Sequence, residues 1–168
     1  MRRIYIPILL LLVAAIAPAS DADAGGNHFR GVLTAFQEPP AVSSEGMGLF
    51  RGHLRNGGDE LQFELSYDGL EGEVLQAHLH LGQHGVNGGI SIFLCSNLGN
   101  GPAGTPECPP PPATITGTLS ADDVIGPVPQ GIAPGEWEEV KRALRAGKVY
   151  ANVHSDKHPG GEIRGQLF

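Results

Sequence analysis

Phe50-Arg51-Gly52-His53-Leu54 is one of four short segments of this chain that share a pattern of an apolar residue, a polar residue, glycine, any residue and leucine. The other three are Phe29-Arg30-Gly31-Val32-Leu33, Ile115-Thr116-Gly117-Thr118-Leu119 and Ile163-Arg164-Gly165-Gln166-Leu167. Alternation of this kind is typical of β-strands with one buried face. Glycine inside a strand usually marks a bend or a close backbone approach. The pattern therefore predicts equivalent strands that coil between two packed sheets.

The rest of the sequence adds strands and one helix. Further strands are predicted over residues 61–67, 74–81, 90–94 and 148–154. Residues 136–146 predict a helix, because apolar residues recur on one helical face and Gly147 can end it. The predicted fold class is all-β, with one short helix near the C-terminus.

Residues 1–24 have the features of a cleaved secretory signal peptide. Arg2 and Arg3 precede an apolar run, which is followed by small residues that offer cleavage sites up to Ala24. The run is shorter than the roughly 20 residues that span a membrane, although a retained N-terminal anchor is the alternative. We expect a secreted or periplasmic protein without membrane insertion after cleavage, with one domain over residues 25–168.

The charge of the chain restricts its partners. The formal net charge is −7 at pH 7, and lysine and arginine form no clusters. Such a chain lacks the basic surface that binds nucleic acid or anionic lipid, and it suits cations better. No serine-nucleophile or phosphate-binding motif is present, so the sequence gives no support to a common hydrolase or nucleotide-binding enzyme.

Cys95 and Cys108 are the only two cysteines of the chain, and they bracket a segment rich in glycine, proline and asparagine. In an oxidising compartment this arrangement predicts a disulfide. A metal site that uses the cysteines is the weaker alternative, because no Cys-x-x-Cys pair exists.

Three histidines form a candidate metal site. His78 and His80 are two residues apart in a predicted strand, so they point to the same side of it, and His154 lies in another predicted strand. Imidazole is a suitable ligand for copper, zinc and nickel. The alternative is a purely structural role, in which the histidines bond to polar groups of the sheet and are oriented by Asn152 and Glu162.

Three motifs together resemble the CHRD domain, which was first described in chordin and is common in secreted microbial proteins. They are a strand that ends in Glu38-Pro39-Pro40, the stretch from Ala77-His78-Leu79-His80-Leu81-Gly82 to Asn87-Gly88, and the closing segment over residues 150–167. The resemblance implies an immunoglobulin-like or Greek-key β-sandwich. The chain has none of the cysteine-rich modules of chordin, so the growth-factor antagonism of chordin is not transferred to it.

The histidine spacing also resembles the copper site of copper-zinc superoxide dismutases, which are Greek-key sandwiches. That pattern further requires a bridging histidine and an aspartate in a zinc loop, whereas the loop after His80 carries His84 and no acidic residue before the first cysteine. A mononuclear site at His78, His80 and His154, with His84 or His158 near its rim, is therefore favoured over a dinuclear one.

Near the chain end, Glu162 and Arg164 alternate with Ile163 and are predicted to form a surface charge pair or a polar network. Three functions remain open. The first is a non-enzymatic CHRD binding module for a protein or a cell-envelope component, and the second is a protein that binds copper or zinc. The third is a superoxide dismutase-like metalloenzyme.

Overall fold

The computed structural model describes residues 26–168, and β-strands are the main regular structure of this part of the chain. The strands are β1 (His28–Thr34), β2 (Met47–Arg55), β3 (Glu60–Asp68), β4 (Val74–Leu81), β5 (Gly89–Ser96), β6 (Ala113–Leu119), β7 (Val149–Ser155) and β8 (Ile163–Gln166). The helices are α1 (Trp137–Arg145) and the short 3-10 helices η1 (Ala35–Gln37), η2 (Asn56–Gly58), η3 (Ala121–Asp123) and η4 (Val128–Gln130). The predicted signal peptide at residues 1–24 lies outside the described residues.

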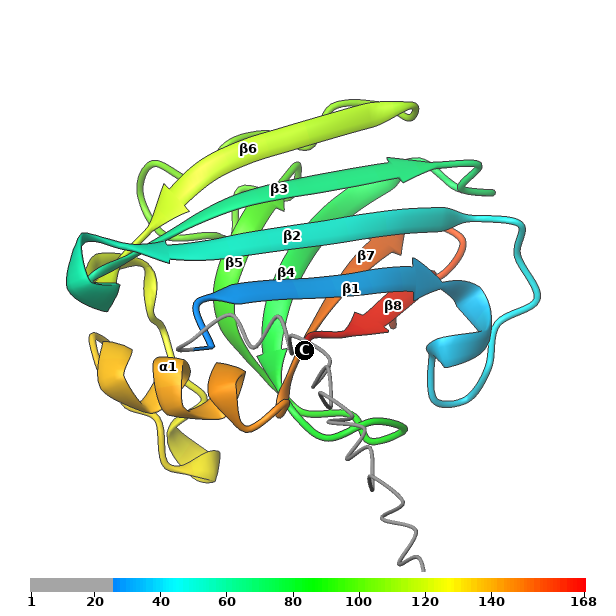
Figure 1. Ribbon diagram of the computed structural model, residues 1–168. Coiled ribbons are helices and arrows are strands. Elements are labelled where there is room, and N and C mark those ends of the chain that lie inside the picture. Colours follow the sequence, from blue (N-terminus) through cyan, green and yellow to red (C-terminus); the bar gives the residue numbers. More distant parts are fainter. Residues whose placement is uncertain (1–25) are drawn as a thin grey trace, which may run out of the picture.

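All eight strands belong to one antiparallel sheet with the order β5-β4-β7-β8-β1-β2-β3-β6. The sheet folds over, so that β1, β2, β3 and β6 form one layer while β4, β5 and β7 cross behind it (Figure 1). The predicted all-β sandwich with one short C-terminal helix is confirmed. The two layers are the halves of one continuous sheet, which is joined where Thr34 of β1 pairs with Arg164 of β8.

Two of the repeated glycines lie where the layers join. A Cβ atom on Gly165 would lie 2.6 Å from the carbonyl oxygen of Val32, and one on Gly31 would lie 2.8 Å from that of Gln166. The backbones of β1 and β8 therefore approach too closely for any side chain at these positions. This close approach is the physical reason for glycine in the sequence pattern of these two strands.

The core fills the space between the layers. It includes residues that are fully buried on both halves of the sheet, among them Phe50, Leu61, Leu79, Val153 and Ile163. Helix α1 lies at one end of the sandwich (Figure 1) and buries Trp137, whose indole nitrogen donates to the Gly58 carbonyl oxygen at 2.7 Å. Among residues 26–168 we find no helix with the length and apolar character of a membrane span.

The predicted disulfide is confirmed. Cys95 at the end of β5 is bonded to Cys108, with the two Cα atoms 5.0 Å apart. Asn97 holds the same loop, because its side chain accepts from the Cys108 amide at 2.8 Å and donates to the Val74 carbonyl at 2.9 Å. The disulfide thus ties the long loop between β5 and β6 to the sheet.

A second buried layer lies outside the sandwich. On β4, Ala77 and Leu79 belong to the core, so His78 and His80 face the opposite side of the sheet. Loop residues lie against this outer face, since the carbonyl oxygens of Gly88 and Pro159 contact His80 and His154. Residues 82–88 are here called the covering loop. It receives three hydrogen bonds from Arg164, which donates to the carbonyl oxygens of Gln83 and Val86 at 3.0 and 2.9 Å and to Asn87 Oδ1 at 3.5 Å. Polar side chains on an outer face are thereby buried.

Candidate metal centre

The three candidate histidines come together on the covered outer face of β4 and β7. In the pairing of these strands, His78 lies opposite Asn152, His80 opposite Tyr150, and Gln76 opposite His154. One potential ligand nitrogen from each histidine lies within 4.8 Å of the others. We call His78, His80 and His154 the histidine cluster. Its members are 0%, 6% and 7% exposed, respectively.

Hydrogen bonds to the backbone define which nitrogens are protonated. His80 Nδ1 lies 2.9 Å from the Gly88 oxygen, and His154 Nδ1 lies 3.0 Å from the Pro159 oxygen. A carbonyl oxygen only accepts, so both Nδ1 atoms carry the proton, and each Nε2 of the neutral rings presents a lone pair. Metal-binding histidines commonly have this kind of backbone partner.

His78 completes the arrangement. Its Nδ1 lies 3.1 Å from His154 Nε2 and donates to that lone pair, which leaves the lone pair of His78 on Nε2. The Nε2 atoms of His78 and His80 are buried, and no group among the described residues is hydrogen-bonded to either. Two buried basic nitrogens thus lack a donor, which costs roughly 1–3 kcal/mol for each.

Burial keeps the cluster neutral. It lowers the pKa of His80 to about 4, although the bond to Gly88 acts in the opposite direction. Burial, with the neighbouring imidazoles of His154 and His80, lowers the pKa of His78 to about 2. The pKa of His154 is also lowered, again by burial. Neutral imidazole is the form that binds metals, so near pH 7 the cluster has the protonation state that metal binding requires.

A carboxylate that sequence reasoning did not assign to the site lies beside the cluster. Glu38, which follows η1, is 6% exposed. Burial raises its pKa to about 7, and the charge of Arg164 and a hydrogen bond from Asn152 offset part of that effect. The one sequence feature that points to Glu38 is its place in the Glu38-Pro39-Pro40 motif, where a carboxylate precedes two residues without N–H groups.

Comparison with protein families places this arrangement in a known domain type. The family model described as "CHRD domain" matches residues 29–167, which is nearly the whole chain. The chain belongs to the CHRD domain family. Searches of curated proteins and of solved structures found no match to it. The three motifs that suggested the family contribute His78, His80, His154 and Glu38 to one place in the fold.

The remaining histidines of this CHRD domain lie outside the cluster. His84 is exposed in the covering loop and does not join the cluster. His158 lies in the turn between β7 and β8, with its Nε2 3.8 Å from a carboxylate oxygen of Glu71. Among residues 26–168, the histidine cluster is the one group of three or more potential ligand side chains. A second metal would therefore lack a comparable ligand set in this part of the chain.

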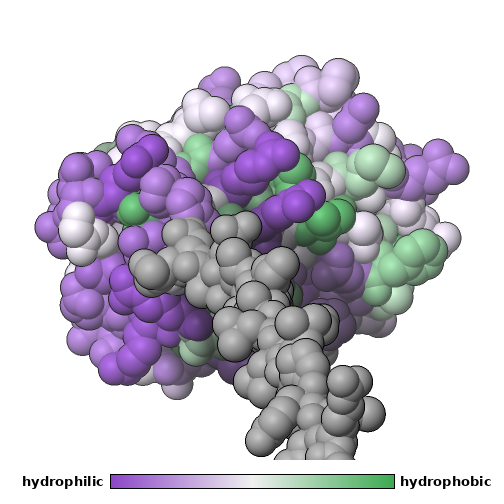
Figure 2. Space-filling model, viewed as in Figure 1, coloured by the Kyte–Doolittle hydropathy of each residue, from purple (hydrophilic) through white to green (hydrophobic). Residues whose placement is uncertain are grey.

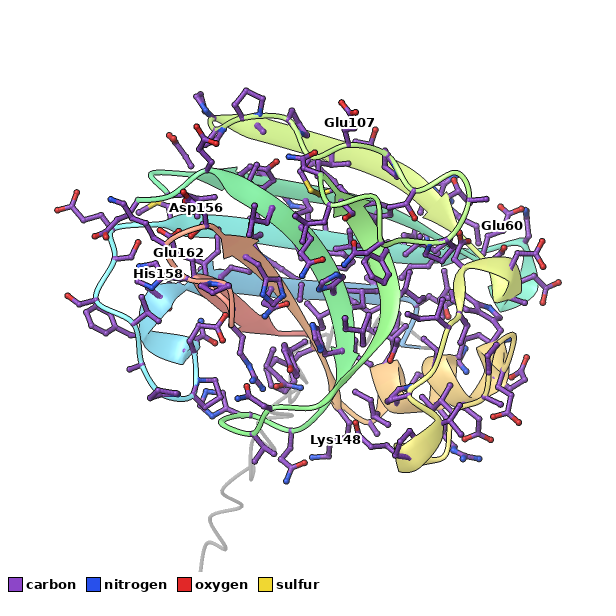
Figure 3. The ribbon with its side chains drawn as sticks, turned by 180° about the vertical axis from the view of Figure 1, so that it is seen from behind. Glu60, Glu107, Lys148, Asp156, His158 and Glu162 are labelled. Atoms are coloured by element: carbon purple, nitrogen blue, oxygen red, sulfur yellow. A yellow bond between two sulfur atoms is a disulfide. The ribbon has the colours of Figure 1, made fainter. Side chains whose placement is uncertain are left out.

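Glu162 and Arg164 belong to a polar network and serve different loops. Glu162 is fully buried and accepts from the Ser44 hydroxyl at 2.7 Å and from the Glu71 amide at 2.6 Å. Figure 3 labels Glu162 close to His158, at the turn between β7 and β8. Arg164 instead holds the covering loop. Both side chains are buried, and each has its own set of hydrogen bonds.

Proposed function

We propose that this protein is an exported CHRD domain protein that binds one copper or zinc ion at His78, His80 and His154. The observation that carries the proposal is a set of three buried imidazoles whose potential ligand nitrogens lie within 4.8 Å of one another. Among the described residues, no group is hydrogen-bonded to His78 Nε2 or His80 Nε2. A metal at His154 Nε2 would replace the hydrogen bond that this atom accepts from His78 Nδ1. Zinc–nitrogen bonds are about 2.0–2.1 Å long, so nitrogens on one ion are at most about 4.2 Å apart. The spacing within the cluster, at most 4.8 Å, comes close to this before any ring rotates.

Burial favours holding a metal over turning over a substrate. The ligand side chains are at most 7% exposed, and the covering loop lies over them. Storage, delivery or sensing of the ion is consistent with such a closed site. A superoxide dismutase-like activity is the alternative, and superoxide turnover by the copper-loaded protein would separate it from binding alone.

Export is part of the proposal. The CHRD domain and the Cys95–Cys108 disulfide fit an extracellular protein. The basic start and apolar run within residues 1–24 support secretion to the periplasm or the medium. Mass determination of the mature protein tests this, because removal of a signal peptide would shorten the chain by about 24 residues.

The deciding experiment measures metal content. The oxidised protein is exposed to Cu²⁺ or Zn²⁺, desalted and analysed by mass spectrometry, beside a His78→Ala, His80→Ala, His154→Ala variant. A His84→Ala variant is the matched control, because His84 is exposed and outside the cluster. We expect about one ion per chain in the wild type and in the control, and none in a triple variant whose circular dichroism shows it folded. Absence of retained metal in the wild type would refute the proposal.

A second candidate function is recognition of a protein or a cell-envelope component. It is favoured by an apolar groove of about 470 Å³ on the outer face of the other layer, lined among others by Val32, Met47 and Tyr67. Figure 2 shows apolar residues gathered toward the end of β1 and the start of β2. There, Val32 is 52% and Met47 62% exposed. Replacing Met47→Glu should reduce association with envelope fractions and leave metal content unchanged. Unaltered partitioning would exclude the groove.

A further inference from the structure

Two oxygen atoms beside the histidine cluster also lack donors. Asn152 Oδ1 and Glu38 Oε1 are buried, and no group among the described residues is hydrogen-bonded to either. The amide of Asn152 donates to the Glu38 carboxylate, which holds the two side chains together. Asn152 also lies close enough to His80 to accept a hydrogen bond if that imidazole is protonated.

The site is therefore lined by acceptors. His78 Nε2 and His80 Nε2 present lone pairs in the neutral cluster. Asn152 lies within hydrogen-bonding reach of His80, and Glu38 lies against Asn152. His80 Nε2 cannot donate to Asn152 without becoming an imidazolium, because its Nδ1 proton is committed to Gly88. A cation and a proton donor between these acceptors would satisfy them.

A metal ion alone does not satisfy all four atoms. Three imidazoles leave a tetrahedral ion one ligand short, which water commonly supplies. Glu38 does not belong to the group whose ligand atoms lie within 4.8 Å of one another. A contact between Glu38 and an ion at the cluster would therefore run through an intervening molecule. A metal-bound water has two O–H groups that can donate. Asn152 Oδ1 and Glu38 Oε1 are two acceptors without a donor among the described residues, so one water could serve both.

We propose that the metal held by the histidine cluster carries one water ligand, which donates its two protons to Asn152 Oδ1 and Glu38 Oε1. This inference rests on the proposed metal binding. It makes the site a three-histidine, one-water centre for a divalent ion, and the Glu38 carboxylate compensates part of the charge. Glu38 and Asn152 are positioning residues, because they act on the ion through the water.

The glycine at position 161 is consistent with this role. A Cβ atom there would lie 2.5 Å from Glu38 Oε1 and 2.9 Å from Asn152 Nδ2. Any side chain at this position would push apart the two groups that hold the water. The turn between β7 and β8 thus packs directly against the Glu38–Asn152 pair.

The test uses the intact disulfide-bonded protein loaded with Cu²⁺. Pulsed electron paramagnetic resonance in H₂O and D₂O detects exchangeable protons of a water bound to copper. We expect such a signal in the wild type and its loss or alteration in Glu38→Gln and Asn152→Leu variants. Copper affinity should fall by about 10–100-fold in both, as is usual when groups that orient the ligands of a metal are replaced. Glu107→Gln is the matched control, because Glu107 is exposed in the disulfide loop, well away from Glu162 in Figure 3.

The outcomes separate the two proposals. Failure of the wild type to bind Cu²⁺ or Zn²⁺ refutes metal binding itself. Metal binding without an exchangeable water signal overturns the inference and leaves the metal site standing. The same holds if Glu38→Gln binds copper as tightly as the Glu107→Gln control. Loss of binding in Glu38→Gln without a water signal in the wild type assigns Glu38 as a direct ligand, and that also overturns the inference.

Discussion

The imidazole of His80 stacks on the phenol ring of Tyr150, with ring centroids 4.8 Å apart and planes 6° from parallel. The guanidinium carbon of Arg164 lies 3.4 Å from the centroid of the same Tyr150 ring. The imidazole and the guanidinium cannot both lie on one face of the Tyr150 ring at these distances. The Tyr150 ring therefore lies between His80 and Arg164. Because Arg164 also binds the covering loop, the stack links the position of His80 to that loop.

Arg164→Lys should therefore weaken both the fold and the metal site. Lysine keeps the charge but cannot stack on Tyr150 while it donates to both the Gln83 and the Val86 carbonyls. We expect a loss of about 2–4 kcal/mol in the free energy of unfolding, since buried charge-assisted bonds are removed. Urea denaturation measures it. Arg51→Lys, at an exposed pair with Glu64, is the control and should change stability by less than about 0.5 kcal/mol. Equal effects would contradict this role for Arg164.

The metal-free protein should lose stability in mild acid. The pKa of His80 is lowered by burial from an ordinary value of 6.5 to about 4 in the folded protein. The unfolded chain therefore takes up the proton first, and the contribution of His80 is complete above pH 6.5 and lost as the pH falls through about 4. Urea midpoints measured from pH 8 to pH 4 in a chelator should decline over this window. In a Glu38→Gln background, which removes the opposing titration of Glu38, a flat profile would show that His80 is not buried as a neutral ring.

Glu38 should act in the opposite direction. Burial raises its folded pKa from 4.5 to about 7, so its contribution is complete below pH 4.5 and lost as the pH rises through 7. A Glu38→Gln variant removes this opposing effect. The decline of stability from pH 7 to pH 4.5 should then be steeper than in the wild type, in the same denaturation series. A shallower decline would argue against a buried, neutral Glu38 at low pH.

Metal should stabilise the folded protein through the cluster. At a free zinc concentration of 100 times the dissociation constant, binding adds about 2.7 kcal/mol to the free energy of unfolding. Thermal melts with and without Zn²⁺ should show this gain in the wild type and in His84→Ala. The gain should vanish in His80→Ala, which removes a ligand. An undiminished shift in His80→Ala would place the binding elsewhere.

Gly165→Ala should destabilise the junction of the two layers. Its Cβ would meet the Val32 carbonyl oxygen at 2.6 Å, so β1 and β8 must separate, at a cost of about 1–3 kcal/mol. Gly160→Ala is the matched control, because a Cβ there meets no atom within 4 Å. Thermal denaturation should distinguish the two variants. Equal melting temperatures would show that the junction tolerates a side chain.

Removing the disulfide should also lower stability. In the chain-entropy model a loop of this size contributes roughly 3 kcal/mol, which corresponds to about 10 °C in the melting temperature of a domain of this length. A Cys95→Ala, Cys108→Ala variant measured by calorimetry tests this. The metal content should not change, since neither cysteine belongs to the histidine cluster. An unchanged melting temperature would mean that Asn97 alone holds the loop.

Local pattern was sufficient for the strands and for α1. Each repeated glycine segment lies in a strand or, in the last case, runs from β8 to the following leucine, and the predicted helix differs from α1 by one residue at each end. The spacing of His78 and His80 was sufficient to place both on one face, because side chains alternate along a strand. Because His84 is close to His80 in sequence, it was predicted to lie near the rim of the site. It is exposed instead, in a loop whose Gln83 carbonyl oxygen faces Arg164.

By itself, then, the sequence determined the strands, the disulfide, the family and the three histidines, because each depends on residue type and on short spacing along the chain. Only the tertiary structure decided that β8 joins the two layers into one sheet and that the histidines lie on its outer face beneath loops. It alone brought Glu38 to Asn152, 114 positions away in the chain. Burial, hydrogen-bond partners and the resulting pKa values depend on these long-range contacts, and so does the chemistry that we propose for the site.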